Sequence, residues 1–432
     1  MKLNQTVAYS FIIAVLLAVP VNLFPRVYMF EIVAVFATMW LFLRDKNATK
    51  LILAFFCVAI VAAISTLQNQ TPASSLFSRE ANFSLALCDG LLVFTLLRQT
   101  HLSNWPRYIV VMSLGIIVTL IYPEDLRALD EPMKFLVGVP LGALVAYFTG
   151  GGRFSSGIRS VIVLFAATLF GGFCFYVGAR NLGGTFLFAS ILWVVFAGYG
   201  VTARKTGRYR SGTSTLLFIL GLAVLGIGLL QGYGMAARTG VFGERAADIA
   251  NAQTESAGNL LLGGRPEIIA NLAAFIDAPI LGHGVGAEGE KYRRLLLESG
   301  YWDETYYILD EGLPLHSVIF GAAAETGILA LLFWTWMLWV LLQAVLAVNI
   351  LRPKHGLVLS FVLLSACWDV LFSPLTGVSR IKFAMALGIA LAILSSFNAA
   401  WANPRSIKNG FGTGGWGWYG VPMRRRNFPR DS

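Results

Sequence analysis

The amino-acid sequence predicts an all-α membrane protein with about twelve membrane-spanning helices and one large loop that contains amphipathic helices. Of its 432 residues, 56% are hydrophobic and only 13% are charged. A soluble domain carries about 25% charged residues. Apolar runs of about 20 residues, which is the length that crosses a bilayer, recur along the chain. With a mean hydropathy of +0.68, the chain cannot be a soluble globular protein.

The candidate spans follow these apolar runs in chain order. They cover residues 7–24, 27–43, 51–66, 83–97, 108–122, 133–148, 160–177, 185–201, 213–232, 316–348, 357–372 and 383–397. The first run lacks a clear signal-peptidase site and other apolar runs follow it, so we interpret it as an uncleaved helix. The run at 316–348 is long enough to be tilted, broken or extended beyond the bilayer.

The distribution of basic residues predicts the orientation of the chain, because short cytoplasmic loops accumulate Lys and Arg. If the amino terminus is cytoplasmic, most of the 33 Lys and Arg residues fall on the cytoplasmic side. We therefore expect a multi-pass protein of the bacterial inner membrane with both termini in the cytoplasm. This topology accounts for the net charge of +10, so the charge does not require a nucleic-acid partner.

The chain divides into four parts on this basis. Residues 1–232 hold nine spans, 233–315 form a large periplasmic loop, 316–402 hold three spans, and 403–432 form a basic cytoplasmic tail rich in Gly and Trp. The loop is far longer than an ordinary connection of about 4–6 residues, and such loops often carry function. Within it, 266–276 and 288–299 have helical periodicity, and we expect both helices to lie flat on the membrane surface.

Arg265 is the first candidate for chemistry in the loop. It follows Gly264, which lets backbone approach a ligand, and precedes Pro266, which suits the first position of a helix. A helix amino end with a guanidinium beside it suits a phosphate or diphosphate. The local pattern alone favours a surface arginine that flanks a helix start.

His316 stands where the large loop enters a long apolar helix. The positive end of a helix dipole disfavours an imidazolium, so the neutral ring could accept a proton as a general base. An interfacial histidine bonded to backbone or headgroups fits this position equally well.

Glu325 follows nine residues later in the same predicted helix. At about 100° per residue it points away from His316 and cannot simply orient that imidazole. A carboxylate inside a membrane normally has a partner, so we expect Glu325 to tie this helix to a neighbour or to an arginine. Asp89 and Asp369 lie inside spans and invite the same interpretation.

Four more basic residues are weaker candidates. Arg180 lies in the short turn at 178–181, where arginine commonly anchors a lipid headgroup, but together with Arg265 it could clamp a diphosphate. Lys291, Arg293 and Arg294 form a cluster on the second loop helix that we expect to face outward. The cluster is either a solvated face or a set of contacts to an acceptor.

The sequence contains no H-E-x-x-H, no Walker A motif, no D-x-D in the large loop and no carboxylate pair with an acid/base spacing. It therefore predicts neither a metal nor another cofactor.

Residues 316–327, which read H-S-V-I-F-G-A-A-A-E-T-G, resemble the H-[NS]-x-x-L-x-x-x-x-E-x-G signature of the O-antigen ligase and polymerase superfamily. Gly264 and Arg265, followed by the stretch D-A-P-I-L-G-H-G-V-G at 277–286, are similar to that family's G-R and P-x-x-G-x-G elements. The turn around Arg180 is similar to its S-R-G turn. Ser317 stands where asparagine is common, and Asn181 replaces the usual glycine.

This resemblance implies a metal-independent, inverting membrane glycosyltransferase that takes a glycan from undecaprenyl diphosphate. The acceptor of a ligase is lipid A–core oligosaccharide, and the product is lipopolysaccharide. His316 would be the base, Arg265 and Arg180 would bind the diphosphate, and Glu325, Gly264 and Gly327 would support them. Lys291, Arg293 and Arg294 would be possible acceptor contacts.

Two alternatives stay open. An O-antigen polymerase uses the same donor with a growing chain as acceptor. A secondary transporter or lipid flippase would also have about twelve spans, although the sequence lacks a convincing internal repeat.

Overall fold

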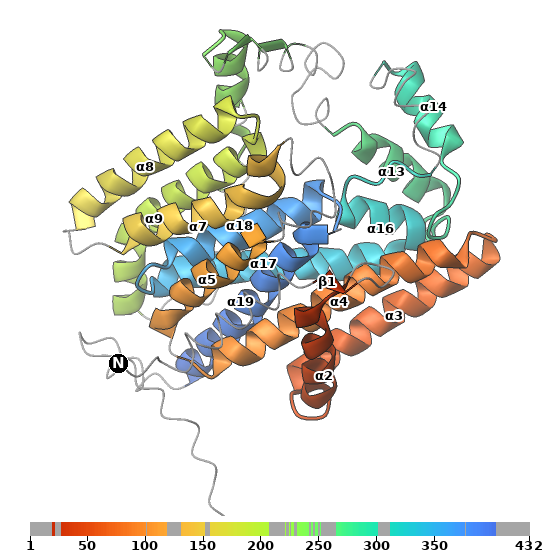
Figure 1. Ribbon diagram of the computed structural model, residues 1–432, viewed down its shortest axis with the longest axis horizontal. Helices are drawn as coiled ribbons and strands as arrows, with labels where there is room; N and C mark the ends of the chain where they lie inside the picture. The colour runs from red at the N-terminus through yellow and green to blue at the C-terminus, as the bar shows by residue number, and fades with distance from the viewer. Residues whose placement is uncertain are drawn as a thin grey trace, which may run out of the picture.

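The computed structural model describes residues 20–21, 27–100, 102–118, 131–151, 156–206, parts of 221–251, 265–300, 312–375 and 377–402. Helices make up most of this part of the chain (Figure 1). The strands within it are β1 (Pro20–Val21) and β2 (Val27–Tyr28), which pair antiparallel. The prediction of an all-α protein is confirmed.

The described helices fall into a large bundle and a smaller pair. The bundle contains α2 (Met29–Phe42), α3 (Lys46–Gln68), α4 (Ala73–Arg98), η1 (Leu102–Asn104), α5 (Trp105–Val118), η3 (Met133–Val137), α7 (Gly138–Gly150), α8 (Ser156–Tyr176), α9 (Arg180–Thr206), α16 (Val318–Thr326), α17 (Ile328–Leu351), α18 (Leu357–Phe372) and α19 (Gly377–Ala402). The pair is α13 (Glu267–Asp277) and α14 (Glu290–Glu298).

Length and apolar composition make this a membrane-embedded protein. Five helical segments in the described part of the chain can cross a bilayer, namely Ala48–Gln68, Ala73–Arg98, Gly157–Tyr176, Ile328–Leu351 and Ser379–Phe397. Large apolar side chains such as Phe36 on α2, Phe56 on α3 and Phe165 on α8 are exposed. Such exposed apolar faces suit contact with lipid.

Helices overlap the predicted runs in the described part of the chain, although α4 begins at Ala73, ahead of the run at 83–97, and α9 continues to Thr206, beyond the run at 185–201. The predicted span at 357–372 coincides with α18. The span predicted at 7–24 lies almost wholly outside the described residues, the one at 213–232 is described only in part, and the tail at 403–432 lies outside them. The run at 316–348 is two helices, because Gly327 adopts φ +77° and ψ −157° between α16 and α17.

Small residues let the central helices approach closely. A Cβ atom on Gly90 of α4 would lie 2.9 Å from Leu387 of α19, and one on Gly388 of α19 would lie 2.5 Å from Val93 of α4. In a membrane, where lipid tails compete for apolar contacts, such close backbone packing is a main source of helix association.

Buried charges also join the bundle. Arg380 of α19 forms an ion pair with Glu31 of α2 at 2.6 Å, and both side chains are completely buried. The same guanidinium donates to the side-chain oxygen of Asn82 on α4. Asp89 of α4 is buried and interacts electrostatically with both Glu31 and Arg380. Arg380 of α19 is the opposite charge near this intramembrane carboxylate, whereas Glu31 of α2 is a like charge, and neither oxygen of Asp89 has a hydrogen-bond partner within the described residues.

At one side of the bundle α13 packs on α16, and α14 packs on α13 (Figure 1). α13 packs on α16 through the small face formed by Ala270, Asn271 and Ala274. The predicted helices at 266–276 and 288–299 are confirmed as α13 and α14, with ends shifted by one or two residues. This packing brings the large loop onto the start of α16.

Candidate functional site

The approach to α13 holds Arg265 in a defined position. Pro266 is the residue before the helix, and its φ of −63° is already helical. The Nε atom of Arg265 donates to the carbonyl of Phe372 at 2.9 Å. Phe372 is the last residue of α18, so the arginine satisfies one of the carbonyls that a helix end leaves unpaired. Gly264 lies outside the described residues.

Arg180 begins α9 and lies near enough to influence Arg265. Burial lowers the pKa of Arg265 from its ordinary value, and the nearby Glu267 carboxylate counteracts this effect. The Arg180 guanidinium lowers the pKa further, whereas the Asp369 carboxylate raises it. The guanidinium of Arg180 also lies 5.9 Å from the ring centre of Tyr233. The charges of Glu267, Arg180 and Asp369 thus all act on Arg265, and the joint clamp of Arg180 and Arg265 stays a prediction.

His316 lies at the mouth of α16, just before the helix cap. Ser317 is the N-cap, and its hydroxyl oxygen accepts from the backbone N–H of Phe320 while its hydroxyl donates to the carbonyl of Leu371. These bonds anchor the backbone beside His316 to α16 and α18. The imidazole itself is 48% exposed, and its Nδ1 atom lies 3.7 Å from Oε1 of Glu267.

Glu267 therefore lies beside His316, the candidate base, and its charge also acts on Arg265, the candidate phosphate-binding residue. It occupies the first turn of α13, two residues after Arg265 in the chain, and its side chain is only 13% exposed. Sequence reasoning missed this residue. The available signal was a carboxylate two residues after Arg265, at the helix start that the sequence already predicted.

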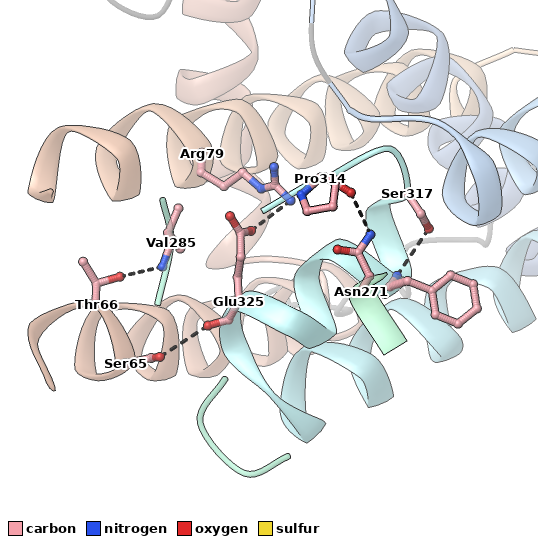
Figure 2. Close-up of polar contacts among 9 residues, drawn as sticks. Ser65, Thr66, Arg79, Asn271, Val285, Pro314, Ser317 and Glu325 are labelled. Atoms are coloured by element: carbon pink, nitrogen blue, oxygen red, sulfur yellow. Dashed lines mark hydrogen bonds and ion pairs between the residues drawn. The ribbon is translucent and has the colours of Figure 1, made fainter. Parts of the chain in front are cut away.

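Glu325 has the arginine partner that its intramembrane position predicts. Its carboxylate forms an ion pair with Arg79 of α4 at 2.9 Å, and Figure 2 shows the two side chains reaching toward each other from α16 and α4. This pair is separate from the contact between His316 and Glu267. The prediction that Glu325 ties its helix to a neighbour is confirmed.

The glycine-rich stretch after α13 closes the break between α16 and α17. The backbone N–H groups of His283 and Gly284 donate to the carbonyls of Ala324 and Glu325, each at 2.9 Å. Across the break, the N–H of Ile328 donates to the carbonyl of Pro279 at 2.8 Å. The stretch thus pairs the backbone groups that the two helix ends leave open.

Two glycines make this closure possible. Gly282 and Gly327 both have positive φ, at +71° and +77°, which side-chain-bearing residues rarely adopt. A Cβ atom on Gly327 would collide with the carbonyl of Ile280, and one on Gly282 would collide with the backbone of Glu325. The end of α3 adds a further anchor, because Ser65 donates to the carbonyl of Glu325 and Thr66 accepts from Val285 (Figure 2).

The basic cluster on α14 differs from the prediction. Lys291 and Arg294 are exposed, but Arg293 is buried, with its guanidinium donating to the carbonyl of Gly312 at 3.3 Å. The expectation that all three residues face outward is wrong for Arg293, because consecutive residues on a helix point about 100° apart. This burial makes Arg293 a link between α14 and the chain that leads into α16.

Both exposed cations on α14, Lys291 and Arg294, form ion pairs. Lys291 is paired with Asp277 at 2.6 Å, and Arg294 is paired with Glu290 at 2.8 Å. Tyr292 also donates to Asp277, and the bonds from Lys291 and Tyr292 lower the pKa of the Asp277 carboxyl. The pocket between α13 and α14 is lined by these two cations and by three carboxylates, those of Asp277, Glu290 and Glu298, so its rim is slightly acidic and not basic.

Comparisons of the chain with protein-family models and with curated proteins give no match. Identification therefore depends on the residues and their geometry.

Proposed function

We propose that this chain is an O-antigen ligase of the bacterial inner membrane. It transfers O-antigen glycan from undecaprenyl diphosphate to lipid A–core oligosaccharide at the periplasmic face, in lipopolysaccharide biosynthesis. The observation that carries the proposal is the meeting of two helix starts. The start of α13 places Glu267 3.7 Å from His316, which precedes α16, and Arg265 lies two residues before Glu267, where the charge of Arg180 acts on it.

The chemistry needs one base and one anion site. The acceptor hydroxyl gives its proton to His316 as its oxygen bonds to the anomeric carbon of the donor sugar. The bond from that carbon to the phosphate oxygen breaks at the same time, and its electron pair leaves with the diphosphate. Attack from the face opposite the leaving group inverts the anomeric centre.

The two arginines take the place of a metal ion in this scheme. A departing diphosphate needs its growing negative charge neutralised more than it needs a proton, and planar guanidinium groups can bind its oxygens two at a time. The pKa of Arg265 is lowered by burial and by Arg180, so an incoming diphosphate would also relieve the repulsion between the two cations. No metal is required at any step.

The outer face of α13 supports a lipid-linked donor. Leu272, Ile276 and Ile280 are exposed although they are large and apolar, and Ile276 reaches 66% exposure. These side chains lie on the same helix and the turn that follows it, directly after Arg265 in the chain. A surface of this kind suits the membrane interface, where a polyprenyl diphosphate presents its phosphates.

The polymerase and the transporter remain the alternatives. A polymerase shares the donor and differs in the acceptor, so the two arginines and the histidine fit it equally well. Lys291 and Arg294 already form ion pairs, so they offer less support for the acceptor contacts expected of a ligase. A flippase or secondary transporter has less support. The contacts described here lie at one side of the bundle and involve groups suited to accepting a proton and binding a diphosphate.

Reconstitution tests the proposal directly. Purified protein in lipid vesicles should convert lipid A–core and undecaprenyl-diphosphate-linked glycan into glycosylated lipid A–core without a nucleotide. The variant His316→Gln serves as the control for background transfer. If only glycan-to-glycan extension is observed, the protein is a polymerase. If donor crosses the bilayer without any transfer, it is a flippase.

A further inference from the structure

Glu267 and His316 are 49 positions apart in the sequence, yet they meet where α13 packs against the start of α16. The 3.7 Å separation between Oε1 and Nδ1 is within ion-pair range and slightly longer than a hydrogen bond. Bonds of this kind are often long before a substrate binds and shorten in the reacting complex.

We propose that Glu267 is the positioning residue for His316, a role that rests on the proposed function. The Glu267 carboxylate holds the imidazole with its proton on Nδ1, which leaves Nε2 as the nitrogen that accepts the proton of the acceptor hydroxyl. A neutral imidazole carries one N–H, and an acceptor beside one nitrogen draws the proton to that nitrogen. Glu267 then stabilises the imidazolium after the transfer.

The exposure of the two groups fits this division of roles. His316 is nearly half exposed, so its ring needs a fixed partner to keep one orientation. Glu267 is largely buried and its Oε2 atom has no hydrogen-bond partner in the described structure. A buried carboxylate keeps a stronger field on a neighbouring group than an exposed one does.

Two plainer roles compete with this one. An acidic residue in the first turn of a helix interacts favourably with the positive end of the helix dipole. The Glu267 carboxylate also raises the pKa of Arg265. Neither role involves the imidazole. Both can therefore be separated from the positioning role by following the ring of His316 itself.

The first test is the tautomer of His316 in the full-length protein. The chain has four histidines, so ¹⁵N-histidine labelling gives few ring signals, and His316→Gln assigns the one of interest. At neutral pH the wild-type ring should carry its proton on Nδ1. In Glu267→Gln the ring should move to a mixture of both tautomers. An unchanged tautomer in the variant would overturn the proposal, whatever the activity.

The second test is kinetic and separates action through His316 from action through Arg265. Glu267→Gln should lower kcat by about 10- to 100-fold, the size of effect seen when a partner that orients a functional imidazole is removed. KM for the lipid-linked donor should change by less than about threefold, because an interaction that acts on the transition state alone lowers kcat without weakening substrate binding. A rise in KM with unchanged kcat would contradict the proposal and assign Glu267 to the arginine site.

A double variant completes the design. In a His316→Gln background, Glu267→Gln should have little further effect, because residues that act as one unit are not additive. A full additional loss would exclude action through the histidine. If the wild-type protein shows the Nδ1 tautomer and loses it in Glu267→Gln, but transfers no glycan, the placement of the imidazole stands and the proposed function fails.

Discussion

The Glu325 carboxylate and the Arg79 guanidinium form an ion pair at 2.9 Å that joins α16 to α4. Glu325 is almost completely buried, and Arg79 is only partly open to the surroundings. Because α16 begins at Val318, two residues after His316, and ends at the glycine break, this pair holds the helix that directly follows the proposed base. It is a structural support and not part of the chemistry.

Removing one partner of this pair should therefore destabilise the protein strongly. Glu325→Gln should lower the free energy of unfolding by about 3–5 kcal/mol, because a buried guanidinium loses its counter-charge. The double variant Glu325→Gln with Arg79→Gln should recover part of this loss. Denaturant unfolding in detergent measures both. Arg98→Gln, which breaks an exposed pair with Asp45, should cost no more than about 1 kcal/mol. A fully additive double variant would mean that the two side chains do not interact.

The predicted topology can be tested by labelling. Cysteines placed at Ser256 and Ser299, in a background without the four native cysteines, should react with an impermeant maleimide in intact cells. A cysteine at Ser406 should react only after lysis, because the tail is expected in the cytoplasm. The reverse pattern would place the large loop inside the cell, and the proposed mechanism could not operate there.

The arginine site makes a sharp chemical prediction. Arg265→Ala should abolish transfer while leaving the protein folded in the membrane, and Arg265→Lys should restore little, because a point charge cannot bind two oxygens in a plane. Arg180→Ala should act in the same direction. Arg98→Ala, an exposed arginine distant in sequence, is the matched control and should retain activity. Transfer assays with and without chelator check both points, since a strict Mg²⁺ requirement would contradict a site that uses arginines alone.

The base role of His316 predicts both a rate and a pH dependence. His316→Ala should reduce transfer by about 10²-fold or more, the low end of what a positioned base contributes. Wild-type activity should fall in acid, because an imidazolium has no lone pair to accept the proton of the acceptor. Initial rates measured from about pH 5 to pH 8 cover the range over which histidine ordinarily changes charge. A flat profile would limit His316 to positioning its neighbours.

Deleting the gene separates the ligase from the polymerase. Loss of a ligase should leave undecaprenyl-linked polymer intact while lipopolysaccharide ends at the core, because only the final transfer is missing. Electrophoresis of lipopolysaccharide together with analysis of the lipid-linked pool measures both products. A core that carries a single repeat unit, with polymer lost, would identify a polymerase instead.

The sequence by itself determined the helices and their class. The run at 357–372 became α18 without shift, because its mostly apolar residues form a buried helix, and Gly356 and Ser373 flank the two ends of that run. Helical periodicity likewise placed α13 and α14. The sequence also predicted that Glu325 needs a partner, since an isolated carboxylate in an apolar bundle is costly.

Only the tertiary structure decided which groups meet. Arg79 lies 246 positions before Glu325, and no local pattern links them. Glu267 gained its proposed role because α13 packs on α16, and Arg293 became buried because the chain at Gly312 crosses α14. Periodicity sets which face of a helix is apolar, but contacts between distant segments depend on how those faces pack together, and that packing places the imidazole of His316 beside a carboxylate.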